Sequence, residues 1–234
     1  AAAFINYVGE REGAKNNLKG KKIAFIYHNS GYGKEPLPTF NKLAKKYGYD
    51  FKALAVDHPG QEQKAAWLQV RRYKPDYVFL TGWGVMNQVA IKEAAAIRFP
   101  MDHFIGNWWS GAEPDVLPAG KTAIGYIAAT FNQPGAGTQA HADIVKHVYG
   151  GDAAAAKKGQ IGQVLYNRGI INAIYDTEAV RTAMGKYGNK AMSGEQVRWG
   201  LENLNLTEAR LGELGVKGFM GPISVSCKDH EGGG

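Results

Sequence analysis

The chain has 234 residues, of which 44% are hydrophobic and 21% charged. This composition is typical of a folded globular protein with one large core or two modest ones, and it excludes a disordered chain. The formal net charge of +7 would suit an anionic partner. The lysines, however, are spread over several elements without interleaved aromatic residues, so nucleic-acid binding is not predicted. The single cysteine, Cys227, excludes an internal disulfide framework and a cysteine-based metal site.

No apolar run approaches the roughly 20 residues of a membrane span. The opening residues, AAAFINYVGEREG, lack the basic, apolar and small-residue regions of a signal peptide. We therefore expect a soluble chain whose export signal, if it had one, has been removed.

The first part of the chain alternates helices with apolar strands. An amphipathic stretch from Ala2 to about Gly9 precedes the strand KIAFIYH, and the glycine-rich turn NSGYGKEPLP leads to a helix from about Thr39 to Tyr47. There follow the strand FKALAVD, the helix EQKAAWLQVRRY, the strand DYVFLTGW, the helix MNQVAIKEAAAIRF and the strand HFIGNWW. This alternation predicts a parallel sheet with right-handed crossovers, in which ligands bind outside the carboxyl ends of the strands. The candidate ligand loops are residues 28–35, 81–86 and 106–115.

The pattern changes after Pro118. AIGYIAATF is predicted as a strand leading into the turn NQPGAGT, so a domain boundary is expected at about residues 132–137. A helix from about Gln139 to Tyr149, a surface stretch rich in alanine and lysine, and a long helix from about Gly162 to Met184 come next. SGEQVRWGLENL is a further helix and GPISVSCKDH a final strand. These strands are too few to close a second sheet, which predicts that part of the second body is missing from the sequence.

The catalytic and nucleotide-binding motifs fail on spacing. GYGK has His28 where a P-loop needs its first glycine and Glu35 where it needs serine or threonine. Gly82 and Gly84 follow a strand, but a dinucleotide fingerprint needs a third glycine where Asn87 stands. Neither Ser30 nor Ser110 lies in a Gly-x-Ser-x-Gly nucleophile elbow.

The six histidines show no metal-ligand spacing, and surface or capping positions are expected for them. His141 and His147 are six residues apart, which places them on different faces of a helix. The sequence therefore predicts no metal, no cofactor and no enzyme.

Aromatic residues gather on the predicted ligand loops. Three of the five tryptophans, Trp83, Trp108 and Trp109, lie there together with Tyr32. Any one of these rings could equally well pack in the core. As a group they favour an aromatic-walled cleft, because rings offer large flat contact areas in a preformed pocket.

The segments KGKKIAFIYHNSGYGKEPLPTF, KPDYVFLTGWG, FIGNWWSG and GFMGPISVSCKDHEGG resemble the leucine/isoleucine/valine-binding protein family, solute receptors of ABC importers. The resemblance implies an α/β fold of two Rossmann-like doubly wound lobes joined by a hinge, with ligand between them. Residues 1–131 would form the C-terminal lobe, residues 132–222 the returning part of an incomplete N-terminal lobe, and residues 223–234 a crossing strand and tail. The chain would be truncated at both ends, without the N-terminal turn that holds the ligand's carboxylate.

The resemblance also implies ligand contacts at particular residues. Tyr32 matches the tyrosine that faces the ligand, and Trp83 falls where an aromatic residue commonly lines the cleft. Trp108 stands where amino-acid-binding members have an acidic residue. The residues predicted to bind the ligand are Ser30, Tyr32, Trp83, Gly84, Trp108, Trp109 and Tyr166.

The function expected from the resemblance is capture of a small apolar or aromatic carboxylate by hinge closure, in a monomeric periplasmic or extracytoplasmic receptor read by a membrane permease. Alternatives are a branched-chain or other amino-acid receptor, a ligand-sensing domain of a regulator, and an α/β enzyme with an unfamiliar motif. Glu113 and Asp115, on the loop after Trp108, are a possible acidic partner for an amine, although GAEPD is more typical of a polar turn that opens a helix.

Overall fold

A computed structural model describes residues 1–230, and the chain divides into two compact units with the boundary between Thr130 and Phe131. The predicted tail at residues 231–234 lies outside the described residues. Each unit is considered by itself below.

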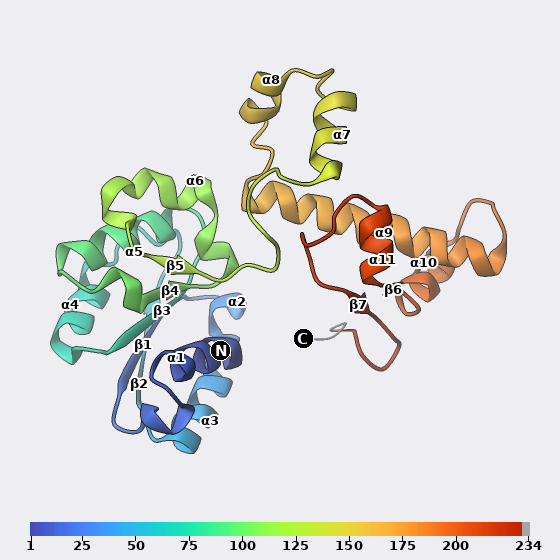
Figure 1. Cartoon of the computed structure of the whole chain (residues 1–234). Helices are drawn as coiled ribbons and strands as arrows, with labels where there is room; N and C mark the ends of the chain where they lie inside the picture. The colour runs from blue at the N-terminus through green and yellow to red at the C-terminus, as the bar shows by residue number, and fades with distance from the viewer. Residues whose placement is uncertain (231–234) are drawn as a thin grey trace. The chain divides into compact units, whose positions relative to one another are not determined.

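The first unit is built on a five-stranded parallel sheet with strand order β2-β1-β3-β4-β5 (Figure 1). Its strands are β1 (Lys22–His28), β2 (Asp50–Val56), β3 (Tyr77–Thr81), β4 (Phe104–Gly106) and β5 (Ile127–Ala128). Its α-helices are α1 (Ala2–Arg11), α2 (Gly31–Lys34), α3 (Leu37–Tyr47), α4 (Lys64–Tyr73), α5 (Val85–Ala96) and α6 (Glu113–Val116). The predicted parallel α/β sheet is confirmed.

Both faces of this sheet are buried, as the continuous apolar strands predicted. Alternate residues of a strand point to opposite faces, so Ala24 and Ile26 of β1 join the core that contains buried residues of α4 and α5. Ile23 and Phe25 belong to a second core with residues of α1 and α3. Figure 1 shows these two pairs of helices on the two faces of the sheet.

Several strand ends were predicted too late. β3 ends at Thr81 and not at Trp83, because the chain turns at Gly84, whose φ of 55° favours glycine. β4 ends at Gly106, since the Asn107 side chain accepts a hydrogen bond from the Ser110 backbone N–H and opens a 3₁₀ turn. Of the segment AIGYIAATF, the strand β5 takes up only Ile127 and Ala128. Within the predicted turn after β1, residues Gly31–Lys34 form the short helix α2.

The second unit is mainly helical. Its helices are α7 (Gln139–His147), α8 (Ala153–Lys158), α9 (Val164–Tyr187), α10 (Gly194–Leu201) and α11 (Glu208–Glu213). β6 (Asn205–Leu206) and β7 (Ile223–Ser224) form an antiparallel pair, the one sheet of this unit among the described residues. The predicted final strand is thus shorter than GPISVSCKDH. The stretch predicted as surface loop contains α8, whose N-terminus is capped by the Asp152 carboxylate.

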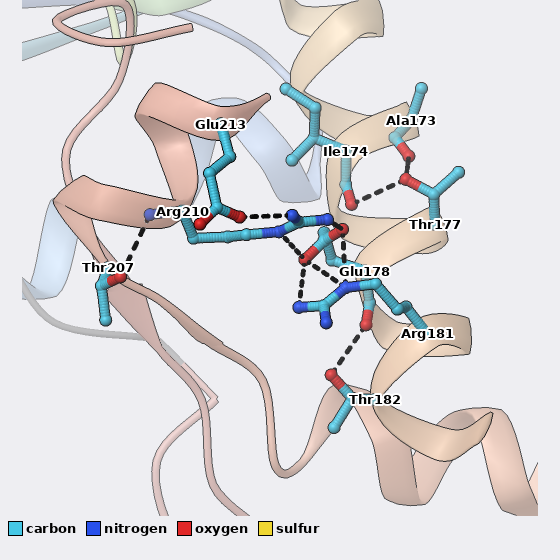
Figure 2. Close-up of polar contacts among 9 residues, drawn as sticks. All are labelled: Ala173, Ile174, Thr177, Glu178, Arg181, Thr182, Thr207, Arg210 and Glu213. Atoms are coloured by element: carbon cyan, nitrogen blue, oxygen red, sulfur yellow. Dashed lines mark hydrogen bonds and ion pairs between the residues drawn. The ribbon is translucent and has the colours of Figure 1, made fainter. Parts of the chain in front are cut away.

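Buried polar side chains hold the helices of the second unit together. Glu178 of α9 is only 3% exposed and accepts hydrogen bonds from Arg210 of α11 and from Arg181 (Figure 2). These bonds, that of Arg210 above all, lower the pKa of Glu178 to about 2, although burial opposes the shift. The ion pair between Glu178 and Arg210 joins α9 to α11.

A second buried polar cluster holds the start of this unit. The Nδ2 group of Asn167 donates to the carbonyl oxygens of Gln133 and Gly135, while its Oδ1 lies 2.9 Å from Nε2 of His141. The expectation of a surface position is therefore wrong for His141, which is 1% exposed because it fastens α7 to α9. It is also wrong for His28, which lies buried at the end of β1.

Candidate functional site

The candidate site lies at the carboxyl edge of the parallel sheet in the first unit. In the sheet, β1 lies between β2 and β3. The connection after β1 runs to β2 on one side, and the connection after β2 crosses to β3 on the other side, so the connections diverge between β1 and β3. Ligands of open α/β sheets bind at such a switch point. The residues that follow β1, β3 and β4 meet here.

The turn after β1 depends on its serine and second glycine. Ser30 caps α2, and its Oγ accepts a hydrogen bond from the Gly33 backbone N–H at 3.3 Å. A Cβ at Gly33 would overlap the carbonyl oxygen of His28, so only glycine fits. The turn places Tyr32 over the edge of the sheet.

Three rings pack together above β1 and β3. The Tyr32 and Trp83 rings are stacked with centroids 5.4 Å apart, and the His28 ring lies 4.5 Å from Trp83. His28 Nε2 is 3.4 Å from His58 Nδ1. Burial, and secondarily His58, lower the pKa of His28, so a neutral imidazole supports Trp83. Trp83 keeps 38% of its surface exposed while its plane is fixed by its neighbours.

A hydrogen-bonded network that the sequence did not predict fixes Asn107 and Ser110. The Asn107 Oδ1 accepts from the Ser110 backbone N–H and from its hydroxyl, and its Nδ2 donates to the Tyr32 phenol oxygen. The Ser110 Oγ also accepts from the Gly82 backbone N–H at 3.1 Å. The network joins the loops that follow β1, β3 and β4.

A pocket of about 290 Å³ opens beside this network. It is lined by Ala1, Ala2, Tyr32, Glu35, Pro36, Thr39, Phe79, Thr81, Asn107 and Trp108. Two of the predicted ligand residues, Tyr32 and Trp108, are therefore brought together around one cavity. Glu35, Thr81 and Asn107 were not named as ligand residues, although all three fall within the candidate ligand loops at residues 28–35, 81–86 and 106–115.

The other predicted residues of the first unit lie outside this lining. Ser30 caps a helix, Trp83 covers His28, and Trp109 is 39% exposed. The Gly84 backbone N–H donates to the Asp115 carboxylate at 2.7 Å.

Asp115 also accepts from the Asn87 side chain at 3.0 Å. This carboxylate is engaged at the start of α5 and does not line the pocket. Glu113 is the first residue of α6, which agrees with the expected polar turn.

Tyr166, the remaining predicted ligand residue, belongs to the second unit. It lies near the start of α9, half-buried, with a side-chain hydrogen bond to Tyr149. Burial, and secondarily this bond, raise the pKa of Tyr166. Its part in ligand binding stays a prediction.

Two wider properties complete the description. Within residues 1–230, no three His, Cys, Asp or Glu side chains come together as metal ligands. None of the helices in that range combines the length and the apolar character that crossing a membrane would require.

The sequence profile of the periplasmic binding protein family matches residues 2–234. A crystal structure described as an ABC transporter permease from the Pseudomonas fluorescens group shares 45% identity and a TM-score of 0.90 over 98% of this chain and 56% of that one. No match was found among curated protein sequences.

More distant structures share the fold. A branched-chain amino acid ABC transporter protein from Thermus thermophilus with bound valine is 20% identical, with a TM-score of 0.72 over 97% of this chain and 57% of that one. A solute-binding protein from R. palustris in complex with benzoate is 17% identical, with a TM-score of 0.62 over 90% and 52%. The chain thus spans about half the length of these relatives. The predicted resemblance is confirmed: the chain belongs to the periplasmic binding protein family, the solute-binding proteins of ABC transporters.

Proposed function

We propose that this protein is the solute-binding receptor of an ABC importer and that it captures a small apolar or aromatic carboxylate. The observation that carries the proposal is the pocket at the switch point of the sheet, whose lining includes the aromatic residues Tyr32, Phe79 and Trp108. Aromatic walls with a few fixed polar groups are typical of sites for small organic ligands. The protein binds without chemical conversion of its ligand.

The surroundings of Trp108 favour a ligand without an amine. In amino-acid-binding members an acidic residue occupies this place, and here the nearby Asp115 is engaged by Gly84 and Asn87. A buried ammonium group without an anionic partner costs several kcal/mol, whereas one neutral hydrogen bond returns about 1 kcal/mol. A cation over the Trp108 ring would recover about 1–2 kcal/mol, which does not offset that cost.

The proposal extends to how the receptor works. Residues 1–131 are proposed as one lobe and residues 132–222 as the part that returns to the other, with the crossing strand starting at residue 223. Segments near Asn132 and Gly221 absorb the rotation as ligand contacts stabilise the closed form. Ser30, Trp83, Gly84, Trp109 and Tyr166 are proposed to contribute contacts in that form. A periplasmic monomer then presents its closed form to the membrane permease.

A receptor for amino acids is the second candidate, because the carboxylate of Glu35 lines the pocket. An ammonium group at the mouth of the pocket could pair with it in water-exposed surroundings. Related structures include one with bound valine and one with 3,4-dihydroxybenzoic acid, so the fold accepts both ligand classes.

Calorimetry of the full-length protein separates the candidates. We expect benzoate or a branched keto acid to bind at least tenfold more tightly than leucine or phenylalanine, and Glu35→Gln to leave carboxylate binding unchanged within about twofold. Tighter binding of the amino acids, lost in Glu35→Gln, would establish the second candidate instead.

A further inference from the structure

The hydroxyl of Thr81 is a buried polar group without a hydrogen-bond partner among residues 1–230. Thr81 is the last residue of β3 and is 1% exposed. Thr81 is nevertheless one of the residues that line the pocket, together with Tyr32 and Trp108. Buried polar atoms in folded proteins nearly always have a partner, and an unpaired one calls for an explanation.

The pairing of the strands places Thr81 beside Asn107. Leu80 of β3 pairs with Gly106 of β4, and the Asn107 backbone N–H donates to the Leu80 carbonyl oxygen. Thr81, the last residue of β3, and Asn107, the residue after β4, are therefore neighbours, on the face that carries Phe79. The apolar core on this face of the sheet therefore ends at two polar residues, Thr81 and Asn107, which line the pocket.

The polar groups of Asn107 beside Thr81 already have other partners, so the Thr81 hydroxyl is available to a ligand. The Asn107 Oδ1 already accepts two hydrogen bonds from Ser110, and its Nδ2 donates to Tyr32. No lysine or arginine is among the residues that line the pocket, whereas the acidic residue Glu35 is. A second carboxylate would be poorly placed here, whereas a neutral hydroxyl or carbonyl oxygen would supply the missing partner.

We propose that Thr81 is a specificity-determining residue, whose hydroxyl binds a neutral oxygen substituent on the part of the ligand that enters this pocket. The receptor then prefers a hydroxylated ligand to the equally sized methylated one. This inference rests on the proposed receptor function and deepens it, because Thr81 would select among ligands by a substituent other than the carboxylate.

Isosteric ligand pairs test the inference on the full-length protein. Calorimetry compares 4-hydroxybenzoate with 4-methylbenzoate, and threonine with valine, in the wild type and in Thr81→Val. Within the class that binds, we expect the wild type to prefer the hydroxylated member about tenfold and Thr81→Val to lose that preference. Thr122→Val is the matched control for binding, because it makes the same exchange of a hydroxyl for a methyl group at a residue outside the pocket lining.

The results separate the two claims. Binding of the amino acids alone would refute the proposed carboxylate class and still test Thr81 through the threonine and valine pair. A preference that survives in Thr81→Val, or a wild type that prefers the methylated ligands, would overturn the role of Thr81 and leave the receptor function standing.

The free protein gives a second readout that needs no ligand. Removing an unpaired buried hydroxyl should not destabilise the fold, so we expect Thr81→Val to melt at the wild-type temperature or up to about 4 °C above it. Thr122→Val is the control, since its hydroxyl donates to the Ala119 carbonyl oxygen at 2.6 Å and its loss should lower the melting temperature. A melting temperature of Thr81→Val as low as that of the control would show that the hydroxyl is already bonded within the protein.

Discussion

The two units bury polar side chains in different places. In the first unit they gather at or near the carboxyl edge of the sheet, at His28, Gln63, Thr81, Asn87, Asn107 and Ser110, above two apolar cores. In the second unit Asn132, His141, Asn167 and Glu178 are buried, and three of them join one helix to another segment. Buried polar groups therefore cluster around the candidate site in the first unit and join helices in the second.

The largest effect is expected in the apolar core of the first unit. Phe25 is fully buried and its ring packs against Tyr27, Phe40, Phe51 and Phe79. Phe25→Ala should reduce the free energy of unfolding by about 3–5 kcal/mol, measured by urea denaturation. Phe25→Leu is the control and should cost much less, because it keeps most of the volume. An equally small loss in both variants would show that ring packing does not dominate this unit.

In the second unit, the buried carboxylate of Glu178 is expected to contribute to the free energy of unfolding. Glu178→Gln leaves Arg210 and Arg181 without their anion and should cost about 3 kcal/mol. Replacing Glu178 and Arg210 together by methionine should restore most of this loss, because no uncompensated charge remains buried. A double variant as unstable as the single one would contradict this account.

Because the pKa of Glu178 is lowered in the fold, the stability of the protein is expected to depend on pH. The pKa of Glu178 is lowered from 4.5 to about 2 in the fold, so the carboxylate stabilises the protein fully above about pH 4.5. This contribution is lost as the pH falls from about 4.5 to about 2. Urea denaturation at pH 6, 4 and 3 should show a steeper loss of stability in the wild type than in Glu178→Gln. If the stability of the wild type and of Glu178→Gln fell equally with pH, groups other than Glu178 would cause the acid sensitivity.

The smallest effect concerns a helix end. The Ser193 hydroxyl accepts from the Gln196 backbone N–H, and the Gln196 side chain accepts from the Ser193 backbone N–H at 3.0 Å. Ser193→Ala should cost about 1 kcal/mol and speed hydrogen exchange at the start of α10, whereas Ser193→Asp should keep the cap. Exchange that is unchanged in Ser193→Ala would show that packing alone fixes this end.

The first unit followed from the sequence better than the second. Continuous apolar strands alternating with amphipathic helices specify a sheet buried on both faces, and Gly48 ended α3 as predicted, with a φ of 73°. α8, β6 and α11 were missed, because they are short and their positions depend on tertiary contacts and on caps such as Asp152 and Thr207. Tyr32 and Trp108 were predicted and do line one pocket. Thr81 began one of the candidate ligand loops, but nothing in the sequence marked it as the residue whose hydroxyl is buried without a partner.

By itself the sequence determined the alternation of strands and helices, the failure of the catalytic motifs and the place of the glycine-rich turn after β1, since all of these depend on local spacing and backbone conformation. Tertiary structure decided which polar residues meet. Thr81 and Asn107 are 26 positions apart (107 − 81) and become neighbours only through the register of β3 with β4. Glu178 and Arg210 pair only because α11 packs on α9. Such contacts depend on strand order and helix packing, which are set by the whole buried surface and not by any one segment.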